Sequence, residues 1–409
     1  MSRDSALSPE RRAGKSQAFL LLLGSCLPIL GAVLLAPVLP AIQDHFSAVP
    51  GSVALVPIVL TLPALMIALL APFAGVLTDK FGRKPLLLAC MLIYTVFGVM
   101  PLWLDSLYSI VASRAGLGLA EAGIMTVCTT LIGDYYSGAK RQRLLALQAV
   151  FASSSAVVFI TLGGLMGQDS WRAPFVLYGV GFIFIPLILY FIWEPLSEQI
   201  SAVNKRRTGY FPWRQLSPLY VFALMAGASL MIVPVQAGYL LNSLGINSPS
   251  QIGMTMGGNQ FGVVVGAIVF RLMSRFAHER TLAGAFMIAG VGLFLMLSAD
   301  THMQVVVGVA VNGVGVGMMI PILATWIMGL VDFDMRGRAM GGFTAAFFGG
   351  EFLSPLIVLA LGGGAIERLP FALGVLASWH IALGFACFLL PVVGAFRKYA
   401  GAQALHDEA

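Results

Sequence analysis

Twelve long apolar segments, separated by short polar ones, occupy most of the 409-residue chain. Each is long enough for a helix of roughly 20 residues to cross a hydrocarbon core. A backbone in lipid must satisfy its own hydrogen bonds, and these segments lack the alternation of barrel strands, so the pattern predicts transmembrane helices. Their approximate bounds are residues 17–42, 52–78, 84–104, 107–133, 144–166, 173–193, 218–243, 250–273, 281–299, 303–331, 340–363 and 370–396.

The composition excludes a soluble protein. Hydrophobic residues make up 58% of the chain and charged residues 10%, with a mean hydropathy of +0.90. Soluble domains carry about 25% charged residues, so water cannot be the solvent for most of this chain. All four cysteines lie in apolar stretches, which indicates neither a disulfide framework nor a metal cluster. We therefore expect no metal and no cofactor.

The positions of the Lys and Arg residues predict the orientation. Of 24 such residues, 21 fall in the tails or in loops on the same side as the N-terminus. Cytoplasmic loops carry this excess of positive charge, so both termini are predicted to lie in the cytoplasm of a multi-pass protein of the plasma (inner) membrane. The formal net charge of +6 is explained by topology, and no nucleic-acid partner is expected.

A weak internal repeat divides the chain into two halves. Arg141-Gln142-Arg143 recurs 195 residues later as Arg336-Gly337-Arg338, and the longest connection lies between the sixth and seventh segments. We predict six-helix bundles at residues 1–193 and 218–409, joined by a cytoplasmic linker at 194–217. Two similar halves place a binding site at their interface. The chain has no P-loop motif, which excludes transport driven by ATP within this chain.

The loop after the second segment carries a recognisable motif. It reads Gly75-Val76-Leu77-Thr78-Asp79-Lys80-Phe81-Gly82-Arg83-Lys84-Pro85. This resembles the G-x-L-x-D-x-x-G-R-[RK] signature of the major facilitator superfamily. The resemblance implies an all-α membrane protein with twelve transmembrane helices in two six-helix bundles, which transports by alternating access and is not an enzyme.

The same resemblance implies a gate on the cytoplasmic side. Arg83 needs a carboxylate partner, and Asp134, at the end of the fourth segment, is the natural candidate. Asp79 is expected against the start of the eleventh segment. The alternative, that these charges only fix topology, explains Arg83 and Lys84 but not Asp79. The predicted gate residues are Gly75, Asp79, Gly82, Arg83 and Asp134.

Apart from Lys84 and Arg271 near segment ends, only three of the 42 charged residues fall inside the segments: Arg114, Glu121 and Glu351. An ionised group at the bilayer centre costs about 2.5 to 3.5 kcal/mol, so these residues indicate function. Arg114 and Glu121 are seven residues apart and share one helix face, roughly 10 Å apart. Arg114-Ala115-Gly116-Leu117-Gly118 is also similar to the R-x-x-x-G motif of proton-coupled members of the superfamily.

Our hypothesis is that Glu121 or Glu351 carries the coupling proton and that Arg114 helps to set its affinity. The alternative is a static pair between helices. Other buried polar residues contact either a substrate or neighbouring helices, and the sequence does not decide between these roles. These candidate substrate-binding residues are Gln236, Asn259, Gln260 and Asn312. For His380 in the last segment we expect a structural role.

The function predicted first is proton-coupled export of a small amphipathic molecule, by resemblance to compact drug and metabolite exporters. Two departures leave the direction open: the fifth segment holds Phe159 and Ile160 where many exporters have Gly-Pro, and the first lacks an acidic residue. The main alternative is proton-coupled uptake of an organic anion, with Arg114 as the anion contact. A receptor without transport activity and a channel are less favoured. Expected partners are a small-molecule substrate, protons and the lipid bilayer, and we expect a monomer.

Overall fold

The computed structural model describes residues 13–73, 78, 80–195, 211–273, 276–332 and 335–389. Within these ranges there are twelve helical spans long and apolar enough to cross a membrane, and no strand. This confirms the predicted all-α fold with twelve transmembrane helices. The predicted bundle bounds stay a prediction, since residues 196–210 of the linker are outside the described ranges. Gly75 and Asp79 of the predicted gate are outside them too.

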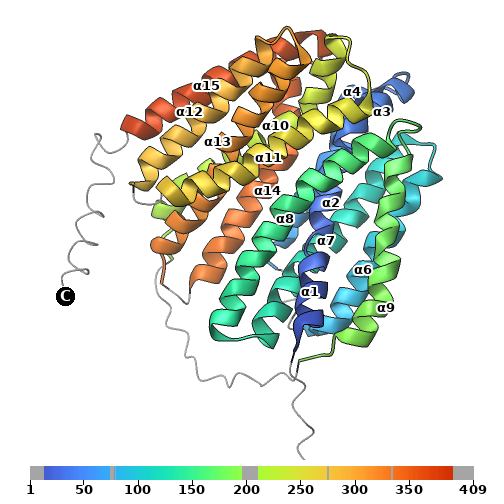
Figure 1. Cartoon of the computed structure of the whole chain (residues 1–409), viewed down its shortest axis with the longest axis vertical. Coiled ribbons are helices and arrows are strands. Elements are labelled where there is room, and N and C mark those ends of the chain that lie inside the picture. Colours follow the sequence, from blue (N-terminus) through green and yellow to red (C-terminus); the bar gives the residue numbers. More distant parts are fainter. Residues whose placement is uncertain are drawn as a thin grey trace, which may run out of the picture.

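The spans follow each other in chain order with short connections (Figure 1). The N-terminal half contains α1 Lys15–Gly24, α2 Leu27–Val33, η1 Ala36–Val38, α3 Leu39–His45, α4 Ser52–Leu70, α6 Arg83–Val99, η2 Met100–Leu102, α7 Leu107–Tyr135, α8 Gly138–Met166, η3 Ala173–Val180 and α9 Gly181–Phe191. The C-terminal half contains α10 Trp213–Ser243, α11 Pro249–Met273, α12 His278–Leu297, α13 His302–Gly329, α14 Arg336–Leu361, η5 Ile366–Arg368 and α15 Leu369–Leu389.

The first span differs from the continuous helix that its hydropathy suggests. It is divided into α1, α2, η1 and α3, with breaks after Gly24 and after Val33. Pro28, Pro37 and Pro40 lie in or next to the short pieces. Proline has no backbone N–H to donate and clashes with the preceding turn, so each one interrupts the helix ladder. The central piece, α2, is consequently a separate unit of only 7 residues.

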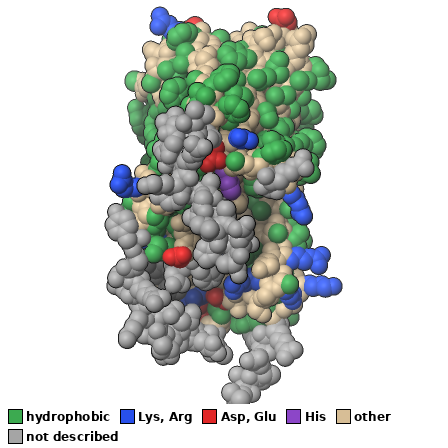
Figure 2. Space-filling view, turned by 90° about the vertical axis from the view of Figure 1, so that its left-hand side faces the viewer, with side chains coloured by type: hydrophobic (Ala, Val, Ile, Leu, Met, Phe, Trp, Pro, Cys, Tyr) green, Lys and Arg blue, Asp and Glu red, His purple; other side chains and the backbone are tan. Residues whose placement is uncertain are grey.

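The molecule has two distinct ends. We call the end at which α6, α8, α12 and α14 begin the basic end, and the end at which α4, α7, α11, α13 and α15 begin the opposite end. Figure 2 shows most of the visible Lys and Arg side chains in its lower part, which is the basic end, and hydrophobic side chains over much of the upper part. Exposed apolar side chains such as Tyr190 and Leu272 are typical of a surface that faces lipid.

The two halves join through close backbone contacts near the opposite end. α8 packs on α11 and α4 packs on α14. A Cβ atom added to Gly164 of α8 would lie 2.9 Å from the Cα of Gly253 in α11, so neither position has room for a side chain. Beyond this crossing, Gln168 Nε2 donates to Ser250 Oγ at 2.6 Å. These contacts close the opposite end.

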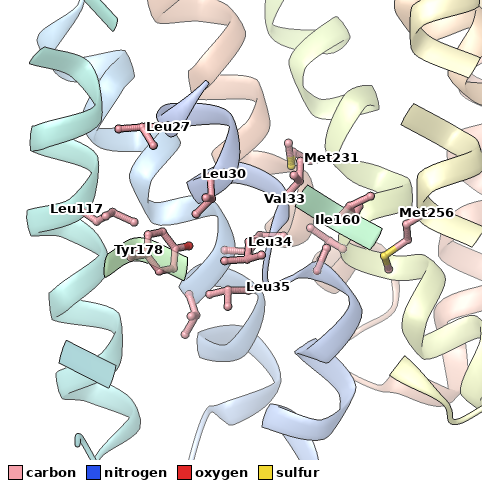
Figure 3. Close-up of a cluster of buried hydrophobic side chains, with 14 of the residues drawn as sticks. Leu27, Leu30, Val33, Leu34, Leu35, Leu117, Ile160, Tyr178, Met231 and Met256 are labelled. Carbon is pink, nitrogen blue, oxygen red and sulfur yellow. The ribbon is translucent and has the colours of Figure 1, made fainter. Parts of the chain in front are cut away.

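Towards the basic end, part of the surface of α14 has no neighbour among the described residues. A Cβ atom at Gly337, Gly341 or Gly349 would meet none of their atoms within 4 Å. The buried hydrophobic residues form two clusters, only one of which joins the halves. One buried cluster contains residues of both halves, whereas a second cluster contains residues of the C-terminal half alone, such as Leu216, Leu323 and Phe343. Figure 3 shows part of the shared cluster.

The close contact between Gly164 and Gly253 predicts that a side chain at position 164 opens the opposite end. In Gly164→Val the new side chain would overlap α11, so we expect the opposite end to stay open for more of the time. The measurement is the rate at which a membrane-impermeant maleimide labels a cysteine introduced as Ser250→Cys. The four native cysteines are buried and should react slowly. We expect faster labelling with Gly164→Val and no change with Gly133→Val, where no atom lies within 4 Å. Equal rates in both variants would contradict this role of the crossing.

Candidate functional site

Glu121 lies on α7 and is buried, with 1% of its surface exposed. Its Oε1 atom is buried without a hydrogen-bond partner. The carboxyl group lies directly against Gly31 of α2, in the space that a side chain at position 31 would fill. An unpaired carboxylate in apolar surroundings is costly, so the geometry favours a neutral, protonated group in this conformation.

Glu351 lies in the C-terminal half, on α14, and is 4% exposed. Its helix packs very closely on α10, because a Cβ atom at Gly227 would lie 3.2 Å from the backbone nitrogen of Glu351. Ser354 Oγ, one turn further, donates to the carbonyl oxygen of Ala228 at 2.7 Å. Among the described residues the Glu351 carboxyl makes no hydrogen bond.

Arg114 bonds to backbone carbonyl oxygens of α6 and not to a carboxylate of the described residues. Its Nη2 donates to the carbonyl oxygens of Phe97 at 3.0 Å and Gly98 at 3.3 Å. The guanidinium lies over the rings of Phe175 and Tyr178, 5.1 and 5.0 Å from their centroids. The side chain is 1% exposed and forms no ion pair within the described residues. Cation–π contacts and backbone carbonyls stabilise the buried charge.

Two aromatic residues that the sequence did not single out connect Arg114 with the first span. The rings of Tyr178 and Tyr94 lie 5.7 Å apart. Tyr94 Oη in turn donates to the carbonyl oxygen of Leu27, the first residue of α2. Arg114, Tyr178 and Tyr94 therefore form a packed row of side chains that reaches the start of α2.

Asn259 and Asn312 hold helices of the C-terminal half together. Asn259 Nδ2 donates to the carbonyl oxygen of Val309 at 2.7 Å and to Asn312 Oδ1 at 3.3 Å. Asn312 Nδ2 donates to the carbonyl oxygen of Ala289 at 2.9 Å. The network links α11, α12 and α13, and such bonds stabilise helix association in lipid.

Gln236 and Gln260 are buried and make no hydrogen bond within the described residues. Gln236 lines a cavity of about 40 Å³ between the halves, together with Gln43 and Tyr239. His380 has a structural environment, because Nε2 bonds Ser229 Oγ at 2.6 Å and Nδ1 bonds the carbonyl oxygen of Leu376 at 2.6 Å.

At the basic end, Arg83 and Asp134 form an ion pair of 3.2 Å between Nε and Oδ2. Gly82 has a φ of +79°, a conformation that suits glycine, and immediately precedes α6. Glu194 also belongs to this cluster around the start of α6, and the sequence did not point to it. Its two carboxylate oxygens accept from the backbone N–H groups of Arg83 and Lys84, each at 2.7 Å. The one signal for it was an acidic residue directly after the sixth span.

The first site prediction concerns Glu194. Glu194→Ala removes an acceptor for the first two N–H groups of α6, so we expect the free energy of unfolding to fall by about 1 kcal/mol. Chemical denaturation in detergent measures this change. Glu194→Gln, which keeps an acceptor oxygen, should lose less, and Glu367→Ala at the opposite end should lose little. A loss that is equal in Glu194→Ala and Glu367→Ala would contradict the assignment.

The second site prediction separates structural from substrate-binding polar residues. Asn312→Ala removes two hydrogen bonds, the one accepted from Asn259 and the one donated to the Ala289 carbonyl, so we expect a loss of about 1 to 3 kcal/mol in the free energy of unfolding. The apparent KM for a transported substrate should stay unchanged. A changed KM with unchanged stability would assign Asn312 to the substrate site instead.

The sequence profile described as Major Facilitator Superfamily matches residues 21–247. Quinolone resistance protein NorA of Staphylococcus aureus (strain MRSA252) is 24% identical over 368 residues, covering 88% of this chain and 93% of that protein. Tetracycline resistance protein, class C, of Escherichia coli is 26% identical over 375 residues, covering 85% of this chain and 90% of that protein.

Solved structures agree on the fold. A bacterial homologue of the human lysosomal transporter Spinster, in an inward-facing and unoccupied conformation, has a TM-score of 0.72 at 16% identity, covering 92% of this chain and 95% of that chain. A D-xylose-proton symporter has a TM-score of 0.73 at 13% identity, covering 91% and 97%. The profile spans more than half of this sequence. The chain belongs to the major facilitator superfamily of membrane transporters.

Proposed function

We propose that this protein is a proton-coupled exporter that moves a small amphipathic organic molecule by alternating access. The observation that carries the proposal is the pair of buried carboxyl groups, Glu121 in one half and Glu351 in the other. Neither forms an ion pair within the described residues, although ionised groups in a membrane span are normally paired. Such a carboxyl group is neutral while its site is closed, and it ionises when the site opens to water or substrate. A group with this behaviour can carry a proton.

The coupling follows from competition for these carboxyls. In the conformation described here the opposite end is closed and the face of α14 near the basic end is open. With the basic end in the cytoplasm, this is an inward-facing state. In this state a carboxyl releases its proton to the cytoplasm, and the resulting carboxylate binds the substrate. After the protein has changed to the outward-facing state, a proton from the outside binds the carboxylate and displaces the substrate. Each carboxyl is therefore occupied by a proton or compensated by substrate, and not both.

The substrate class is inferred from the relatives and from the available polar groups. The relatives are named for quinolone and tetracycline resistance. Such molecules combine flat apolar rings with a few hydrogen-bonding groups. Gln236 and Gln260 are buried with unused hydrogen-bonding capacity and are the proposed polar contacts. Asn259 and Asn312 already bond to neighbouring helices.

The same proposal includes the location. Both termini lie in the cytoplasm and the protein lies in the plasma (inner) membrane, since the positive charge is concentrated at the end from which the first span starts. A monomer is proposed with it. The pair of Arg83 with Asp134, together with Gly82, forms the cytoplasmic gate. Gly75 and Asp79 of the family motif complete this proposed gate. Uptake of an organic anion through Arg114 is less well supported, because that guanidinium is bonded to α6 and covered by aromatic rings.

Transport in proteoliposomes tests the proposal. With an imposed proton gradient, we expect a quinolone or tetracycline to accumulate against the direction of proton flow. Glu121→Gln and Glu351→Gln mimic the protonated group and should reduce gradient-driven accumulation, while exchange of labelled compound without a gradient persists. Glu367→Gln, outside the spans, is the matched control.

The outcomes distinguish the functions. Accumulation in the direction of proton flow would establish uptake and overturn export. Dissipation of the compound's own gradient alone would indicate a channel. Full gradient-driven activity of both Glu→Gln variants would exclude these two residues as the proton carriers.

A further inference from the structure

The slot that holds the Glu121 carboxyl is formed by a residue of the broken first span. A Cβ atom built on Gly31 would lie 2.8 Å from Glu121 Cδ and 3.2 Å from Oε2, and would overlap Oε1. The carboxyl group therefore fills the volume of a missing side chain. Any larger residue at position 31 must displace either the carboxyl or α2.

The slot is apolar. The residues of α2 read Leu-Pro-Ile-Leu-Gly-Ala-Val and bring no polar side chain to the carboxyl. The charged or titratable groups that interact with it are Arg114 on its own helix, Tyr94 on α6, Tyr178 on η3 and Glu351 on α14. Arg114 and Tyr94 bond to backbone carbonyls and leave Oε1 unsatisfied.

The helix α2 is anchored in its own half. It packs on α4, α7 and α8, and Figure 3 shows Leu30 on the side of Leu117 of α7. The pieces that follow it, η1 and α3, contact α10 of the other half. The first span therefore holds Gly31 against α7 and reaches the other half through η1 and α3.

The corresponding place in the other half also holds a glycine. Gly227 of α10 follows Gly31 by 196 residues, close to the 195-residue repeat of the basic turns. There the close approach brings the α10 backbone against the backbone nitrogen of Glu351. The first helix of each half therefore uses a glycine to approach a helix that carries a buried glutamate.

We propose that Gly31 is the positioning residue of the proton site: its missing side chain seats the Glu121 carboxyl in a slot between α2 and α7. This inference rests on the proposed function, in which Glu121 carries a proton. The seat fixes where the carboxyl lies, so a side chain at position 31 would displace the group that takes up and releases the proton.

The experiment compares Gly31→Ala, Glu121→Asp and the double variant in proteoliposomes with a quinolone as the probe. Gly31→Ala should reduce proton-driven accumulation roughly 10- to 100-fold, since a misplaced reacting group costs about that much. Glu121→Asp shortens the side chain by one methylene group and makes room for the new Cβ. The double variant should therefore recover the activity of Glu121→Asp alone. Gly284→Ala, which meets no atom within 4 Å, is the matched control and should behave as the native protein.

A second readout keeps the inference separate from the transport proposal. The unfolding midpoint in detergent should fall in Gly31→Ala and in Gly31→Ala/Glu121→Gln, because Gln has the size of Glu, and should recover in Gly31→Ala/Glu121→Asp. Native-like midpoint and transport in Gly31→Ala would overturn the inference. So would a double variant with Asp that is no better than Gly31→Ala. If Glu121→Gln itself transports normally while the midpoints follow the expected order, the seat exists but the proposed proton role of Glu121 fails.

Discussion

Close approach of helix backbones at glycine is the contact on which this structure depends. Lipid tails are as apolar as leucine, so burial from lipid supplies little force between helices, and dispersion contacts at short range must hold them. Between α11 and α13, a Cβ at Gly262 would lie 3.2 Å from Gly313 Cα, and one at Gly266 would lie 3.1 Å from Gly317 Cα. The same principle joins α8 to α11 across the two halves at Gly164. A side chain at any of these positions would separate a helix pair.

The distribution of these contacts also gives the molecule its functional asymmetry. Gly164 and its partner close the opposite end, while the glycines of α14 near the basic end face open space. Alternating access requires that such contacts be exchanged without breaking the cores of the halves. The separate hydrophobic cluster within the C-terminal half, which includes Leu216 and Phe343, fits this requirement because it allows that half to move as a unit.

Burial of a few charges is the second constraint. Arg114 is stabilised by carbonyl oxygens and aromatic faces of the N-terminal half, although its Nη1 is buried without a hydrogen-bond partner. Glu121 and Glu351 have no comparable stabilisation among the described residues. Groups buried without partners are costly to keep ionised, and they persist where they serve a purpose. This contrast is the reason for proposing the two glutamates, and not Arg114, as the proton carriers.

The sequence by itself determined the number of spans, the placement of Lys and Arg at one end, and the short list of intramembrane charges. These follow from solvation, which depends on residue type along the chain and hardly on neighbours in space. The signature around Gly82 and Arg83 also pointed correctly to the superfamily. Only the tertiary structure decided the partners, because a contact depends on where two distant helices meet. It turned Arg114 towards carbonyls of α6, used Asn312 to bind helices, placed Glu194 at the start of α6, and seated Glu121 on Gly31. No pattern along the sequence records that an atom is missing at one position so that a carboxyl from a helix 90 residues away can occupy its place.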